Sequence, residues 1–199
     1  MPTGETTYQL KVTLNGIRPP VWRRLLVPGS LSLTHLHDVL QVAMGWTDSH
    51  LHQFVAKGVV YALPEPDFGT EARNEARVRI DEVLRDKKDA MVYEYDFGDG
   101  WEHSIVLEKL LPTETGAPSC IAGARACPPE DCGCICGYKN LLEITRDPKH
   151  PEHEEMLDWL GGAYDAEHFD TTQVNAALSR MKLRGLPRSS ATARKRPAP

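Results

Sequence analysis

The sequence predicts an α+β fold: an antiparallel β-sheet, a helix in the N-terminal half and a helical C-terminal third. Residues 8–14 alternate apolar and polar side chains, which is the period of a half-buried strand. Residues 90–97 and 101–110 favour strands and enclose a glycine-rich turn. From residue 138 onward, helical segments are bounded by proline and glycine. Strands followed by a block of helices are typical of the α+β class.

The first two strands are expected to form an antiparallel hairpin. The apolar residues of 8–14 share one face, and the Asn-Gly pair at 15–16 breaks the strand. Two prolines at 19–20 forbid a helix, and residues 21–27 resume as the second strand.

A helix of about three turns follows this hairpin. Ser32 or Thr34 can cap it, and apolar residues then recur at helical spacing up to the Gly-Trp pair at 45–46. Three polar residues are expected on its solvent side: His35, Asp38 and Gln41.

Residues 50–56 are predicted to form a strand with His50 and His52 on one face, and 59–61 a further short strand. Residues 62–77 are expected to be a surface loop. A short helical turn is predicted to start at Asp81, which is a good N-cap residue.

The rest of the chain is divided by its glycines and prolines. Residues 112–137 lack an apolar period and predict a long irregular loop. Helices are predicted at 138–147, 151–160 and 171–183, the last with Asp170 as its cap. We expect one domain over residues 7–183, with a flexible start at 1–6 and a disordered basic tail at 184–199.

Composition narrows the function class. The formal charge of −5 argues against a protein built to coat phosphate backbones. No apolar run is long enough to span a bilayer, and the start of the chain has neither a basic region nor an apolar one typical of a secretion signal. All five cysteines fall between Cys120 and Cys136, and their odd number makes reduced thiols the expectation. A cytoplasmic location without membrane contact is expected.

Polar and aromatic residues of four segments make up the candidate functional site. Carboxylates and an imidazole are unusually dense around the turn at 96–103, and a stiff Pro-Pro dipeptide at 128–129 precedes two further acids. The candidate residues are Trp46, His50, His52, Asp96, Asp99, Trp101, Glu102, His103, Glu130 and Asp131.

Two donor sets could hold a divalent metal such as zinc. The first consists of His50, His52, His103 and Asp99, because two histidines at strand spacing face the same side and a carboxylate can orient a third. The second consists of Cys120, Cys127 and Cys132, although the chain lacks the C-x2-C pairs usual in zinc sites. A plain structural role remains open for both sets: histidines on a polar rim, Asp99 bonded within its turn, and unligated thiols.

The chain resembles the Ri-plasmid ORF-three-like family, which includes passenger proteins of insertion elements. The resemblance covers roughly residues 7–182 in order. Its motifs are Val21-Trp22-Arg23-Arg24, Met44-Gly45-Trp46, His50-Leu51-His52-Gln53-Phe54, Tyr95 to His103, Cys127-Pro128-Pro129-Glu130-Asp131-Cys132-Gly133, Gly137-Tyr138, and Asp147-Pro148 to Asp158-Trp159-Leu160. The resemblance implies an α+β domain but no reaction or ligand. In the family pattern a second glycine follows Gly133, whereas this chain has Cys134, which would be strained if the backbone there has a positive φ.

Three functions are compatible with these residues. The first is a noncatalytic binding or accessory module of mobile-element origin that holds a protein, peptide or nucleic-acid partner. The second is a metal-dependent enzyme, hydrolase-like, with Asp99 or Asp131 completing the histidine site and Glu102 or Glu130 as base. The third is an interaction domain with a structural zinc in the cysteine loop. Convergence of the histidines and acids on one cleft would favour the enzyme.

Overall fold

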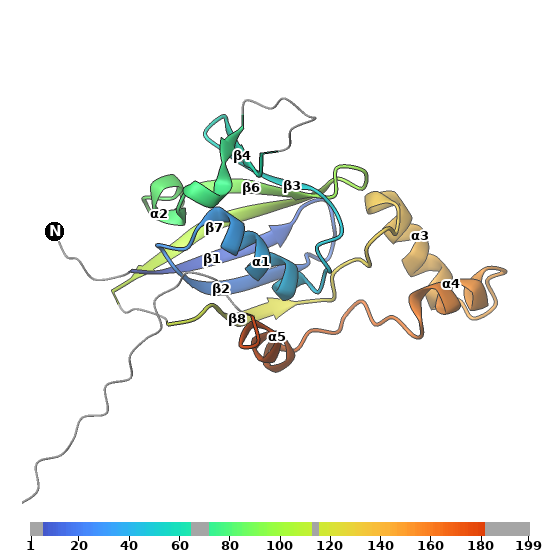
Figure 1. Ribbon diagram of the computed structural model, residues 1–199. Coiled ribbons are helices and arrows are strands. Elements are labelled where there is room, and N and C mark those ends of the chain that lie inside the picture. Colours follow the sequence, from blue (N-terminus) through green and yellow to red (C-terminus); the bar gives the residue numbers. More distant parts are fainter. Residues whose placement is uncertain (1–5, 65–71, 113–115, 182–199) are drawn as a thin grey trace, which may run out of the picture.

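The computed structural model describes residues 6–64, 72–112 and 116–181 of the chain. It has an α+β architecture in which one mostly antiparallel sheet carries helices (Figure 1). The expected tail at 184–199, and the expected flexible start except residue 6, lie outside the described residues.

Eight strands form the sheet, in the order β5-β4-β3-β6-β7-β1-β2-β8. Their bounds are β1 Thr7–Leu14, β2 Trp22–Pro28, β3 His52–Ala56, β4 Val59–Ala62, β5 Arg73–Asn74, β6 Ala90–Tyr95, β7 Trp101–Leu111 and β8 Ser119–Ala124. All neighbours pair antiparallel except β4 and β5, which are parallel. The predicted hairpins β1–β2 and β6–β7 are both confirmed.

The helices differ in length and position. Their bounds are α1 Leu33–Met44, α2 Ile80–Val83, α3 Cys134–Arg146, α4 His153–Leu160 and α5 Thr171–Leu178, with a 3-10 turn η1 at Glu75–Arg77. The helix α1 lies against one face of the sheet, and α5 lies beside the edge strand β8 (Figure 1). The amide of Asn175 pairs with both backbone groups of Cys120, so α5 takes the place of a further strand there. None of the described helices is long and apolar enough to cross a membrane.

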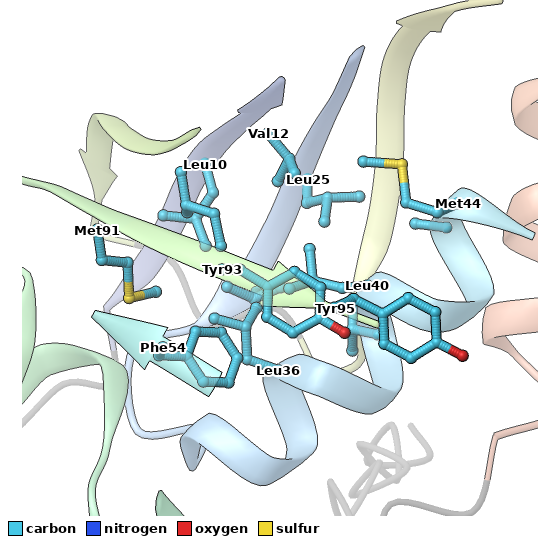
Figure 2. Packing of buried hydrophobic residues seen from close by; sticks show 14 of the residues in the cluster. Leu10, Val12, Leu25, Leu36, Leu40, Met44, Phe54, Met91, Tyr93 and Tyr95 are labelled. Carbon is cyan, nitrogen blue, oxygen red and sulfur yellow. The ribbon is translucent and has the colours of Figure 1, made fainter. Parts of the chain in front are cut away.

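The core lies between α1 and the sheet. Alternation puts Leu10 and Val12 of β1 on the covered face, and both are fully buried. Figure 2 shows the rings of Phe54 and Tyr93 close to Leu36 of α1, and the two ring centroids lie 4.9 Å apart. Burial of this apolar face, at about 25 cal/mol per Å², is the main driving force for the sheet–helix packing.

Two predicted loops contain regular structure. Within 62–77, β5 pairs with β4 and is followed by η1, whose Glu75 is fully buried. Within 112–137, β8 pairs with β2, and α3 already begins at Cys134. The strands β5 and β8 are stabilised by pairing with neighbouring strands. Their own sequences therefore need not show a periodic apolar pattern.

Several element boundaries and one helix face also differ from the prediction. The strand expected at 50–56 begins at His52, so His50 precedes it in a loop. Gln41, expected on the solvent side of α1, is 4% exposed because its amide donates to the Tyr93 hydroxyl at 2.9 Å. The predicted caps Ser32 of α1 and Asp170 of α5 are confirmed by their side-chain hydrogen bonds.

Candidate functional site

Three loops that are far apart in the sequence meet at one end of β6. Trp46, just after α1, stacks on Tyr95 with ring centroids 4.9 Å apart, and its indole nitrogen donates to the carbonyl of Pro128 at 2.9 Å. A carboxylate oxygen of Asp99 accepts the backbone N–H of Gly133 at 3.1 Å. These contacts fix the loops after α1, β6 and β8 to one another, so the sequence motifs of the candidate site converge.

Glu130 serves as the polar anchor of this junction. Its carboxylate accepts hydrogen bonds from the Tyr95 hydroxyl and from both the backbone N–H and hydroxyl of Thr47. Burial acts to raise the pKa of Glu130, but the hydrogen bonds from Thr47 and Tyr95 outweigh it and lower the pKa below its usual value. A carboxylate held by these donors is engaged in structure and is a poor candidate for a general base.

The first donor group consists of His50, Asp96 and Asp131, whose ligand atoms all lie within 4.8 Å of one another. His50 Nε2 is 3.2 Å from Asp131 Oδ1 and 3.7 Å from Asp96 Oδ2. Nevertheless this nitrogen is buried and makes no hydrogen bond to any described group. Two ligands of one ion at about 2.1 Å and tetrahedral angles lie about 3.4 Å apart. The observed spacings lie on either side of that value.

The backbone presents both carboxylates of this group. Asp96 has φ 57°, and its Oδ1 accepts the N–H groups of Gly98 and Asp99, which leaves Oδ2 directed at His50. Asp131 has φ 59°, and its side chain is 70% exposed. Aspartate adopts positive φ more readily than most non-glycine residues, and this conformation sets the direction of both side chains. The group is therefore held from one side and open to solvent on the other.

The second donor group consists of His37, Asp48 and His52. The two imidazoles stack with centroids 3.5 Å apart and planes 4° apart. His37 Nε2 contacts Asp48 at 2.8 Å, and His52 Nε2 contacts the fully buried Glu75 at 3.0 Å. Because an ion must lie in the plane of each imidazole that ligates it, two parallel stacked rings cannot share one. This group is thus a set of hydrogen-bonded side chains and not a site for one shared ion.

Burial sets the protonation of His37. The pKa of His37 is lowered, first by burial and then by the neighbouring His52, although Asp48 opposes the shift. The other ring nitrogen of His37 lies 2.8 Å from the Tyr93 hydroxyl, whose pKa burial raises. A neutral His37 between a carboxylate and a phenol keeps its ring orientation fixed.

A cavity of about 340 Å³ joins the two donor groups. His50 of the first group and all three residues of the second line it, together with an apolar rim. Its lining residues are Thr34, His37, Asp38, Asp48, His50, Leu51, His52, Gln53, Val60, Ala62, Leu63, Ala72 and Phe97. His50 and His52 of the predicted site thus line one hollow of small-molecule size, whereas Asp96 and Asp131 lie outside its lining.

Not every predicted site residue reaches this cavity. His103 is fully buried on the covered face of β7, with its ring edge-on to Trp46, and burial lowers its pKa to about 4. Trp101 is also a core residue, whereas Glu102 alternates to the exposed face. The predicted His50–His52–His103–Asp99 set therefore does not form: His50 and His52 belong to different donor groups, and neither group found among the described residues contains His103 or Asp99.

The cysteines belong to neither donor group. All five are free thiols, and neither donor group found among the described residues contains a cysteine. Burial raises the pKa of Cys127 and Cys132 to about 12, which keeps both thiols protonated. Cys134 does have the positive φ, 60°, that its replacement of the family's glycine suggested.

Three residues of the second donor group and its surroundings escaped the sequence analysis: His37, Asp48 and Glu75. The sequence does indicate that His37 is buried, because residues 33, 37, 40 and 44 recur at helical spacing on the buried face of α1. For Asp48 and Glu75 no local pattern distinguishes a functional or buried acid from a solvated one, since their partners come from other segments.

Comparison with known proteins gives consistent matches. A family model described as "plasmid pRiA4b ORF-3-like protein" matches residues 6–173. The uncharacterized protein y4hQ of Sinorhizobium fredii (strain NBRC 101917 / NGR234) is 41% identical over 176 residues, which is 87% of this chain and 91% of that protein. The crystal structure of MM3350 from Methanosarcina mazei Go1, a protein of unknown function, matches with a TM-score of 0.76 and 36% identity, over 85% of this chain and 98% of the other.

Proposed function

The chain belongs to the plasmid pRiA4b ORF-3-like family, and we propose that it is a divalent-metal-dependent enzyme of hydrolytic type. In this proposal His50, Asp96 and Asp131 hold the ion, and the adjoining cavity receives the substrate. An accessory role in plasmid or mobile-element biology, suggested by the family, is the proposed cellular context.

The observation that supports the metal most strongly is the state of His50 Nε2. A buried imidazole nitrogen without a hydrogen bond costs free energy, on the order of 1–3 kcal/mol. Two carboxylate oxygens face it at 3.2 and 3.7 Å, a spacing suited to a shared ion. A divalent cation would satisfy the nitrogen and neutralise both carboxylates at once.

The donor set also favours chemistry over a purely structural ion. Structural zinc sites have four protein ligands, whereas catalytic sites keep a position open for water or substrate. Among the described residues the group contains three ligands, and the exposed Asp131 leaves it accessible. A metal in this position would activate a water molecule as a nucleophile near neutral pH. The rings of His37 and His52 line the cavity and are rigidly held, so they would orient what binds there.

A noncatalytic binding module is the second candidate. Three large apolar side chains, Leu51, Leu63 and Phe97, line the cavity and are 42–50% exposed. Exposed apolar side chains gathered at one hollow favour a binding surface. This function needs the cavity but no reaction.

The test is calorimetric titration of chelator-treated protein with Mn²⁺ and Zn²⁺, followed by turnover assays on a panel of chromogenic esters, amides and phosphoesters. We expect one ion per chain in the wild type, and at least tenfold weaker binding in Asp96→Asn and His50→Ala, because each loses one of three ligands. The matched controls Asp158→Asn and His168→Ala alter exposed residues outside the site and should bind as the wild type does.

The outcomes separate the candidates. Metal-dependent turnover that is lost in Asp96→Asn supports the enzyme. Metal binding without turnover on any panel member favours the binding module. No binding of either ion, or binding that Asp96→Asn leaves unchanged, would contradict the metal proposal.

A further inference from the structure

The charge on the cavity wall is one-sided. Two carboxylates, Asp38 and Asp48, line the cavity, and its described lining contains no lysine or arginine. The other polar lining residues are three histidines, Thr34 and Gln53, and burial lowers the pKa of His37, so this ring adds no positive charge at neutral pH. An anionic group entering this hollow would therefore meet carboxylates without any cationic side chain to pair with.

Asp38 is the carboxylate whose charge is opposed, among the described residues, only by nearby histidines, His37, His35 and His52. Asp48 contacts His37 at 2.8 Å, and its backbone N–H donates to Gln41. Asp38, one residue after His37 on α1, accepts no hydrogen bond and forms no ion pair with any described residue. Burial raises its pKa, which is the direction expected for a carboxylate that has lost water without gaining a donor.

Much of the remaining lining is apolar. Phe97 is 50% exposed, Leu51 45% and Leu63 42%, and the smaller side chains of Val60 and Ala62 continue the surface. A ligand that buried one aromatic or branched group against these side chains would remove apolar area from water on both partners. At about 340 Å³ the hollow is at the small end of ligand pockets.

We propose that this cavity binds a small cationic amphiphile: a primary or secondary amine whose nitrogen faces Asp38 and whose apolar group packs against Phe97 and Leu51. This inference rests on the proposed function for the cavity being a substrate site, and it names the substrate class. It does not depend on the metal for binding. The charge of Asp38 favours an amine over an alcohol. A carboxylate is disfavoured because the described residues that line the cavity include no lysine or arginine.

Three probes of one shape test this proposal: 3-phenylpropylamine, 3-phenylpropanol and 3-phenylpropanoate. Each is titrated calorimetrically at pH 7.5 and low salt into chelator-treated protein and again into Mn²⁺-loaded protein. We expect the amine to bind about tenfold more tightly than the alcohol, equivalent to 1.4 kcal/mol, and the carboxylate to give no measurable binding to chelator-treated protein.

Two variants assign the contacts. Asp38→Asn should weaken amine binding about tenfold and leave alcohol binding unchanged, because only the charge is removed. Phe97→Ala should weaken the amine and the alcohol by the same factor, since both share the phenyl group. Asp158→Asn, an exposed acid of α4, is the control for a general effect of charge. Thermal unfolding of each variant checks that the fold is retained.

The results also distinguish this inference from the metal proposal. Amine binding without any metal binding would support the cavity assignment and overturn the metal enzyme. Metal binding together with carboxylate binding equal to that of the amine in chelator-treated protein, or with an Asp38→Asn variant that binds the amine normally, would overturn the amine assignment alone.

Discussion

The burial of His103 should couple folding to pH. Its side chain is fully buried, and burial lowers its pKa from the usual 6.5 to about 4. The unfolded chain therefore binds this proton at a higher pH than the folded chain does. The stabilising contribution of a neutral His103 is complete above pH 6.5 and is lost as the pH falls from 6.5 towards 4.

The magnitude follows from the two pKa values. Between pH 7.5 and pH 5, a shift from 6.5 to about 4 makes the free energy of unfolding fall by about 2 kcal/mol on account of this residue. Because the pKa of His37 is also lowered, the wild type alone cannot assign the effect. The variant His103→Leu removes only the contribution of His103.

The assay is urea unfolding of the wild type and His103→Leu at both pH values. We expect the loss of unfolding free energy between pH 7.5 and 5 to be about 2 kcal/mol smaller in His103→Leu than in the wild type. Equal losses in the two proteins would refute the placement of a neutral His103 in the core and would reopen its role as a ligand.

Three further substitutions test the supports of the site by urea unfolding. Glu75→Ala should destabilise the chain by about 3–5 kcal/mol, because it removes the buried acceptor of His52, whereas Glu75→Gln keeps an acceptor and should cost less; equal effects would contradict this. Cys134→Gly should stabilise by about 1 kcal/mol, since φ is 60° there, and a loss of stability would show that the side chain matters more than the backbone. Gly137→Ala should destabilise by about 2–4 kcal/mol, because an added Cβ would lie 1.9 Å from the Cys132 carbonyl oxygen; wild-type stability would contradict that close approach.

The strands with a clear period could be predicted from the sequence. The apolar positions of β1 and the glycine turn between β6 and β7 determine their own pairing. The edge strands β5 and β8 could not, because β5 has only two residues, both polar, and β8 consists mostly of small residues. Their structure depends on partners that the local sequence does not reveal.

For the candidate site, sequence patterns could name residue types but not their grouping. His50, Asp96 and Asp131 were each recognised, yet the sequence paired His50 with His52 because a strand was expected to begin at His50. With the strand starting at His52, His50 turns towards the two acids and His52 towards Glu75. A shift of two residues in one boundary thus placed His50 and His52 in different groups.

The most direct test of the metal proposal is an anomalous difference map from crystals of the wild type grown with Mn²⁺ or Zn²⁺. We expect one strong peak bonded to His50 Nε2, Asp96 Oδ2 and Asp131 Oδ1, with a further position open towards the cavity. A peak at the cysteine thiols, or no peak within bonding distance of His50 in fully loaded crystals, would contradict it.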